Sequence, residues 1–100
     1  MAVGDVTSVL SSVNANAFLD IQPASSAEWC ITNLYYGGKI EVYFYDGANS
    51  ILIDSDSTAT STVPGSMQGR CFHVNNTRYI RIKNVDSAEK YLAYDGIVTK

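Results

Sequence analysis

The residues best suited to chemistry in this 100-residue sequence are its one histidine, His73, and its two cysteines, Cys30 and Cys71. A nucleophilic cysteine needs a neighbouring base, and that base needs a group to orient it. In an extended strand Cys71 and His73 point to the same side but lie about 7 Å apart along the chain. No catalytic motif surrounds either residue. We therefore expect His73 to be a solvated strand side chain and the protein not to be an enzyme.

Metal and cofactor sites have little support in the sequence. Two cysteines and one histidine do not complete a zinc tetrahedron, and their spacing is not that of a zinc knuckle. Asp54 and Asp56 offer two carboxylates to a calcium ion, with Asp46 and Asn49 in the preceding turn as further oxygen donors. The EF-hand pattern is absent, so we expect a strand end followed by a solvated loop. No Gly-rich phosphate loop is present, and we expect no metal and no cofactor.

The cysteines are too few to form a disulfide scaffold. We expect Cys30 and Cys71 to be small buried side chains. A disulfide between them requires Cα atoms within about 7 Å, which the sequence leaves open.

Tyrosine is the commonest aromatic residue, with seven copies against three phenylalanines. Strand alternation turns Tyr43, Tyr45 and Tyr79 outward, and tyrosine suits protein interfaces because it buries a large ring and keeps a polar hydroxyl. We therefore assign these three residues to a partner interface. Two alternatives stay open: the tyrosines lie across the rim of the fold, or their rings stack on a glycan.

Basic residues gather in the C-terminal half, where Arg78, Arg81 and Lys83 form one local patch. Such a patch either protects a strand edge by charge or meets an acidic protein partner. We add these three residues to the candidate interface.

The composition fits one domain that other surfaces cover in part. Charged residues make up 17% of the chain, below the roughly 25% usual in soluble domains. The net charge of −3 argues against a nucleic-acid partner. No apolar run approaches the ~20 residues of a membrane span, and residues 1–12 lack the features of a signal peptide. We expect no membrane partner and synthesis in the cytoplasm.

Alternation of apolar and polar residues predicts strands through most of the chain. Trp29–Tyr36 and Lys39–Tyr45 read as strands joined by a tight turn at Gly37-Gly38, because glycines supply the positive φ angles of a hairpin. A turn at Asp46–Asn49 leads to a third strand, Ile51–Ser55. We expect these three strands to form a meander.

The remaining strands are shorter. They are expected at Ala17–Gln22, Arg70–Val74 and Tyr79–Lys83, and at Lys90–Tyr94 and Gly96–Thr99, a last strand or pair broken at Asp95-Gly96. Within them Ile80 and Ile82 point inward. About seven to eight antiparallel strands without a helix predict an all-β fold, either a β-sandwich or a jelly-roll-like small barrel.

Two segments are harder to interpret. Val6–Val13 has helical spacing, but its Val, Ser and Thr content favours an extended chain. Residues 1–16 are thus expected as an arm that adds to a neighbour's sheet or as an edge strand of their own domain, residues 17–100. Val6 and Val9 join the candidate interface on this basis. Asp56–Gln68 reads as a long polar loop.

Several segments resemble small β-rich virion proteins of tailed bacteriophages. They are Ile21–Ala24, Ala27–Tyr36, Val42–Gly47, Ile53–Ser57, Tyr79–Ala88 and Tyr94–Lys100. The chain is similar to capsid decoration (cement) proteins, and the resemblance leaves the head or tail position open. It implies a non-enzymatic structural protein on the capsid surface, commonly a homotrimer, that bridges subunits of the major capsid protein and stabilises the head. The alternative is a tail or fibre-associated adhesin, a carbohydrate-binding β-sandwich module.

Overall fold

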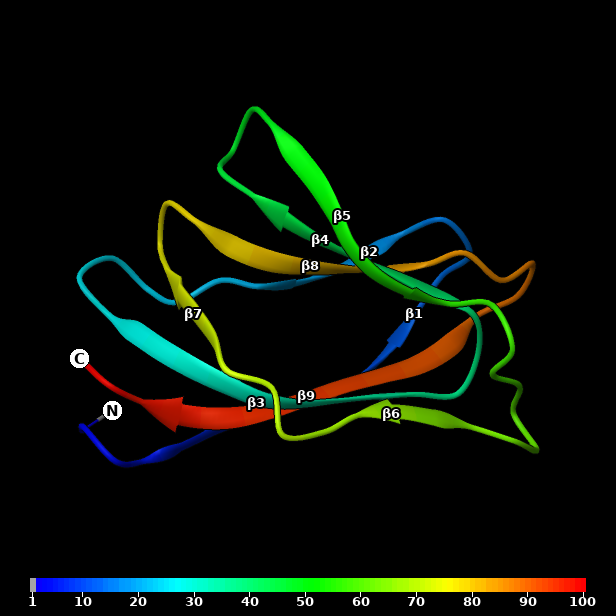
Figure 1. Ribbon diagram of the computed structural model, residues 1–100, viewed down its shortest axis with the longest axis horizontal. Helices are drawn as coiled ribbons and strands as arrows, with labels where there is room; N and C mark the ends of the chain where they lie inside the picture. The colour runs from blue at the N-terminus through cyan, green and yellow to red at the C-terminus, as the bar shows by residue number, and fades with distance from the viewer. Residues whose placement is uncertain (1) are drawn as a thin grey trace.

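The computed structural model describes residues 2–100, and every regular element in that range is a β-strand. Two antiparallel sheets pack face to face as a sandwich (Figure 1). The strands are β1 (Val6–Val13), β2 (Phe18–Ile21), β3 (Glu28–Tyr36), β4 (Ile40–Tyr45), β5 (Ser50–Asp56), β6 (Gly65–Met67), β7 (Phe72–Asn75), β8 (Tyr79–Asn84) and β9 (Lys90–Val98). The expected all-β sandwich is confirmed. Within residues 2–100 no helix has the length and apolarity to cross a membrane.

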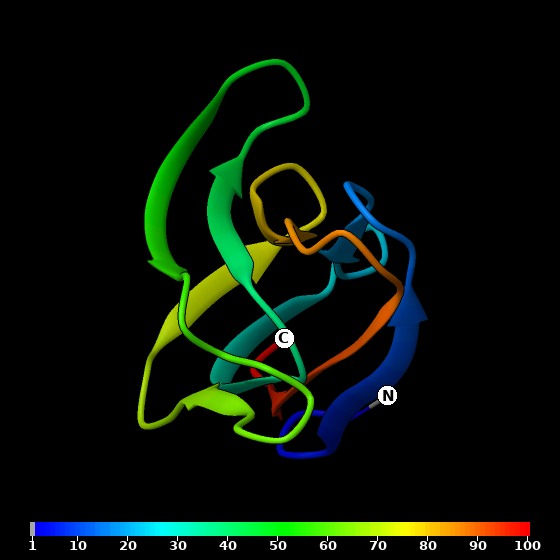
Figure 2. The same cartoon turned by 90° about the vertical axis from the view of Figure 1, so that its right-hand side faces the viewer.

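The two sheets differ in size. The five-stranded sheet has the order β1-β9-β3-β6, and β7 also pairs with β3. The four-stranded sheet has the order β2-β8-β4-β5. Figure 2 shows the sheets end on, with the β4–β5 hairpin (green) extending beyond the body of the sandwich. Strands β1 and β5 are therefore edge strands of different sheets.

The core lies between the sheets and follows the alternation of the strands. Ile31 and Leu34 from the five-stranded sheet are fully buried, as are Val42 and Ile82 from the four-stranded sheet. Ile80 is also buried, as the alternation predicted. Burial of one side chain of this size contributes roughly 1.5–3 kcal/mol, so this apolar layer is the main source of stability.

The expected meander over residues 28–55 is wrong in its first turn. Strand β3 pairs with β6, β7 and β9, whereas β4 pairs with β5 and β8, so Gly37-Gly38 crosses from one sheet to the other. Neither glycine has a positive φ. A Cβ at Gly38 would lie 2.8 Å from both the Asp86 carboxylate and Lys90 Cγ, so a close approach, not a hairpin turn, requires glycine there. The second predicted turn is present, with Gly47 at φ 95°.

Two other expectations need correction, and one open alternative is decided. Strand β9 runs without a break through Asp95-Gly96, because Gly96 lets the backbone of β3 approach where a Cβ would collide with Cys30 and Ile31. The long loop contains β6, three residues that pair with the end of β3. Strand β1 pairs with β9 along all eight of its residues, so of the two alternatives for the N-terminal segment, an arm or an edge strand, the structure has the edge strand.

Asn84, at the end of β8, is a fully buried polar side chain. Its Nδ2 donates to the carbonyl of Val13 at 2.8 Å and to that of Ala88 at 2.9 Å. Its Oδ1 accepts from the N–H of Asp86 at 2.9 Å. Because Val13 ends β1, this one amide joins the two sheets.

Replacing Asn84 tests the strength of that connection. Asn84→Ala leaves two carbonyls and one N–H without their partner, so we expect the free energy of unfolding to fall by about 2–4 kcal/mol. Asn14→Ala, at an exposed position nearby, is the matched control and should change it by less than about 0.5 kcal/mol. Urea unfolding followed by circular dichroism measures both. Equal effects of the two substitutions would contradict this role of Asn84.

Candidate binding surfaces

Arg81 is the centre of a compact cluster on the outer face of the four-stranded sheet. Its guanidinium carbon lies 4.0 Å from the ring centre of Phe18 and 4.4 Å from that of Tyr45. Its Nε donates to Asp20 Oδ1 at 2.7 Å. Tyr43 packs edge-on against Phe18 with ring centres 6.1 Å apart. Cation–π contacts and an ion pair therefore hold this aromatic surface in one arrangement.

The tyrosine hydroxyls on this face are bound within the chain. Tyr43 donates to Glu41 Oε1 at 2.6 Å, a bond that raises the pKa of the tyrosine, and Tyr45 donates to the carbonyl of Gly47 at 2.9 Å. Arg81 covers one face of the Tyr45 ring. A sugar that stacked on Tyr45 would have to displace the guanidinium from that face or use the other one.

Tyr79 lies on the outer face, as the alternation predicted, but it is not exposed as an interface residue would be. Tyr79 is 8% exposed, because the ring of Tyr45 packs edge-on against it with centres 5.5 Å apart. The two are register partners on β8 and β4, so Tyr79 shares the outer face but lies beneath its neighbour.

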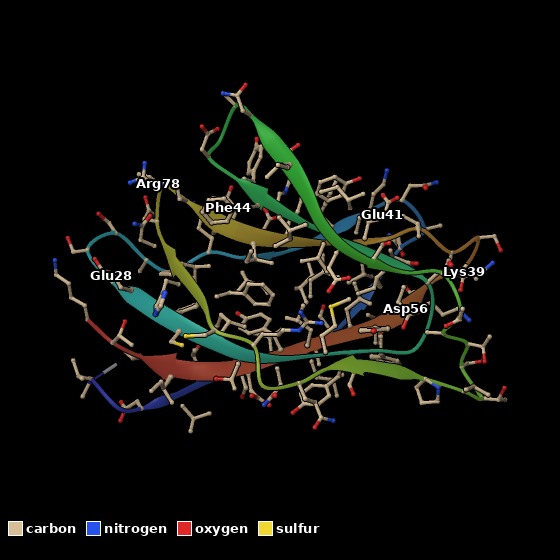
Figure 3. The ribbon with its side chains drawn as sticks, in the orientation of Figure 1. Glu28, Lys39, Glu41, Phe44, Asp56 and Arg78 are labelled. Atoms are coloured by element: carbon tan, nitrogen blue, oxygen red, sulfur yellow. The ribbon has the colours of Figure 1, made fainter. Side chains whose placement is uncertain are left out.

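The other predicted interface residues fall into three places. Lys83 lies on the aromatic face, with Nζ 5.8 Å from the Phe18 ring centre. Arg78 lies at the β7–β8 turn (Figure 3), where it lines a hollow with Phe44 and Ile51. Val6 and Val9 lie on β1 at the edge of the other sheet, 68% and 37% exposed. The eight residues thus do not form one surface.

The outer face of the five-stranded sheet is a second surface, and it is apolar. Register pairing aligns Val6 of β1 with Ile97 of β9 and Ile97 with Cys30 of β3. A parallel row aligns Leu10 with Ala93, and Ala93 with Tyr35. Leu10 is 72% exposed and Ile97 46% exposed. Exposed apolar groups arranged in contiguous rows are typical of a contact surface.

A hollow lies beside the second row. It has a volume of about 420 Å³ and is lined by Leu10, Tyr35, Tyr91 and Pro64, among others. Between the rows the carboxylate of Asp95 accepts from Asn33 Nδ2 and from the Tyr35 hydroxyl, both at 2.8 Å. We refer to these two rows and the hollow as the apolar face. In the sequence, this face is indicated by Tyr91, Ala93 and Ile97, which lie on the same side of one strand. The interface predicted from the sequence did not include them.

Cys30, Cys71 and His73 come together on the same side of this sheet. Cys30 and His73 are register partners on β3 and β7, and Cys71 immediately precedes β7. The two Sγ atoms lie 3.2 Å apart, and Cys71 Sγ lies 3.5 Å from His73 Nε2. His73 is exposed, as expected, but the expectation of two buried cysteines is wrong: Cys71 is exposed and Cys30 is half-buried, because both lie on the outer side.

The thiols influence each other, while the histidine lacks an orienting group. The hydrogen bond with Cys71, then burial, then the charge of the Cys71 thiolate raise the pKa of Cys30. Within residues 2–100, Cys71 Sγ is the side-chain hydrogen-bond partner of the imidazole. On one extended strand, the side chains of Cys71 and His73 would lie about 7 Å apart. Cys71 precedes β7 and is not part of it, and its Sγ lies close to the imidazole of His73.

The carboxylates considered for calcium have separate partners. Asp54 forms an ion pair with Arg70 at 3.1 Å. Asp56 accepts from the Tyr36 hydroxyl at 2.9 Å and from the N–H and hydroxyl of Thr58. Burial, then the bond to Asp56, raises the pKa of Tyr36 to about 12. Figure 3 shows Asp56 at the Lys39 end of the sandwich, opposite the end that carries Glu28 and Arg78. These contacts hold loops in place and do not assemble a calcium site.

Comparison with models of known protein families and with curated proteins finds no match for this chain.

Acid should weaken the fold through three carboxylates. Backbone hydrogen bonds are the largest cause that lowers the pKa of Asp46, Asp56 and Asp86 below 3.8. Because the pKa of each carboxyl is lower in the folded state, the unfolded chain binds protons more readily. The stabilisation from these groups is therefore complete above about pH 4 and is lost as the pH falls through their pKa values in the folded state. We expect urea unfolding at pH 3 to need less denaturant than at pH 7.

The pH dependence has a matched test. The triple substitution of Asp46, Asp56 and Asp86 by Asn should flatten the difference between the two pH values, whereas Glu89→Gln, at an exposed site, should preserve it. A triple variant with the pH dependence of the parent would refute the assignment.

Proposed function

We propose that this chain is a non-enzymatic structural protein of a tailed-bacteriophage virion, a capsid decoration protein that stabilises the head by bridging capsid subunits. The observation that supports this proposal best is the apolar face, a set of exposed apolar side chains beside an open hollow. The resemblance of six sequence segments to small phage virion proteins is the reason for placing this surface in a virion. The low charge of the whole chain agrees with a surface that is covered in use.

A second copy of this chain is the proposed occupant of the apolar face. The chain carries a net charge of −3, so copies repel each other where their acidic surfaces meet. On the apolar face the charge of Asp95 is already hydrogen-bonded to Asn33 and Tyr35. Copies that meet there bury apolar area together with a carboxylate that already accepts two hydrogen bonds, which reduces the cost of taking it out of water. In a trimer, one part of this face contacts one neighbour and another part contacts the other neighbour, so every subunit makes the same contacts and the ring closes.

The aromatic cluster then faces the capsid shell. Tyr43, Tyr45 and Arg81 lie on the opposite sheet from the apolar face, so a trimer built through one sheet leaves the other free. Tyrosine and arginine are the side chains that most often contribute strongly to protein interfaces. Arg81 is already held by Phe18, Tyr45 and Asp20, which lowers the entropy lost when it binds.

Self-association is tested by light scattering over a dilution series. We expect the parent chain to be a trimer. The control variant Ile51→Asp places a charge at an exposed apolar site on the other sheet (62% exposed) and should also be a trimer. Leu10→Asp should raise the dissociation constant by at least about tenfold, because it buries a charge in the contact. A parent that stays monomeric at every concentration, or equal losses in both variants, would count against the proposed contact.

Shell binding is tested by co-sedimentation with expanded phage capsids. Arg81→Ala should weaken binding by about tenfold or more, since it removes the residue that organises the aromatic cluster. Arg78→Ala, at the separate β7–β8 turn, is the matched control and should bind as the parent does. Binding to a glycan array but not to capsids, lost on Tyr43→Ala, would instead favour the adhesin function and overturn the capsid role.

A further inference from the structure

We propose that Cys30, Cys71 and His73 form a binding site for a thiophilic metal ion, with Zn²⁺ as its representative. The ligand atoms are the two Sγ atoms and an imidazole nitrogen of His73, and all three lie within 4.8 Å of one another. Within residues 2–100 this is the one such group of three. The inference does not rest on the proposed virion role: it is argued from these three side chains, of which Cys30 also ends the first row of the apolar face.

One distance between the ligand atoms matches a tetrahedral zinc site and a second is close to it. Zn–S bonds of about 2.3 Å and Zn–N bonds of about 2.0–2.1 Å place two sulfurs about 3.8 Å apart and a sulfur and a nitrogen about 3.5 Å apart. Cys71 Sγ and His73 Nε2 are 3.5 Å apart, and the two Sγ atoms are 3.2 Å apart. A metal ion between the thiols therefore requires the sulfurs to separate by about half an ångström, which a change in one χ angle supplies.

The backbone holds the three residues in place without a metal. Cys30 and His73 sit in an antiparallel ladder that also pairs Ile31 with Phe72 and Trp29 with Val74. On the other side of Cys71, the N–H of Arg70 donates to the carbonyl of Thr32 at 2.9 Å. The chain on both sides of Cys71 is thus bound to β3. Ligands on paired strands keep their geometry better than ligands on free loops, so little entropy is lost when the metal binds.

The chemistry of the ligand set selects the ion. Two thiolates and an imidazole favour Zn²⁺ and Cu⁺ over Ca²⁺ and Mg²⁺, which prefer oxygen. On binding, each thiol releases its proton to solvent and forms a metal–sulfur bond, and with Zn²⁺ no electron is transferred. Cys71 and His73 are exposed, so the fourth position of the tetrahedron faces outward and is free for a water molecule.

Metal binding is tested on the full-length, reduced protein without oxygen. Co²⁺ is added first, because thiolate ligands give its complexes intense charge-transfer absorption, and Zn²⁺ is then added to displace it. We expect one ion per chain, a spectrum that shows two thiolates, and full displacement by Zn²⁺. Bound Zn²⁺ should also slow the reaction of both thiols with an alkylating reagent, an independent readout of the same contacts.

Single substitutions assign the ligands. Cys30→Ser, Cys71→Ser and His73→Ala should each weaken Zn²⁺ binding by more than about 100-fold, because even groups that only support metal ligands contribute 10- to 100-fold. Glu89→Gln should bind as the parent does. Circular dichroism identifies any variant that has lost its fold. In His73→Ala, the protection by Zn²⁺ of the two thiols from alkylation is a second measurement of whether the histidine is a ligand.

Three results would overturn the proposal. The first is the absence of a one-to-one complex with Co²⁺ or Zn²⁺. The second is a His73→Ala variant that binds as tightly as the parent, which would leave only a thiol pair. The third is alkylation of both thiols at the same rate with and without Zn²⁺, which would show that the metal does not contact the sulfurs.

Discussion

The Asn84 amide is the contact on which the junction of the two sheets depends. It is fully buried at the end of β8, and its three hydrogen bonds reach the end of β1 and the turn that leads to β9. A buried amide without partners is strongly unfavourable, so this position is stable only when all three groups are in place. Apolar packing favours contact between the sheets but does not fix their alignment. The directional bonds of Asn84 fix it at this end of the sandwich.

Once the sheets are aligned, their outer faces differ in chemistry. The four-stranded sheet presents Arg81 between the rings of Phe18 and Tyr45. The five-stranded sheet presents the apolar face and the group of two cysteines and a histidine. Each outer side chain alternates with an inner one, so the pattern that builds the core also sets these surfaces. One small domain thus carries two chemically distinct faces.

An irregularity in β3 determines which of its residues point outward. The register with β9 shifts between Ile31 and Asn33, so Ile31 and Leu34 both point inward although they are three residues apart. Regular alternation would place Ile31 and Leu34 on opposite faces, and the shift places both in the core. The shift leaves Cys30 on the outer side, next to β7, and places Asn33 where it bonds to Asp95. One extra residue in a strand thus prepares both the apolar face and the proposed metal site.

The sequence by itself determined the fold class, most strands and their inward residues, such as Ile80 and Ile82, because alternation is a local property of the chain. It also determined the β4–β5 hairpin, whose Gly47 needs a positive φ. Only the tertiary structure decided that β3 and β4 belong to different sheets, that Tyr45 covers Tyr79, and that Cys30 lies beside Cys71. The physical reason is that strand partners distant in sequence are chosen by the burial of whole faces. No local pattern records that choice.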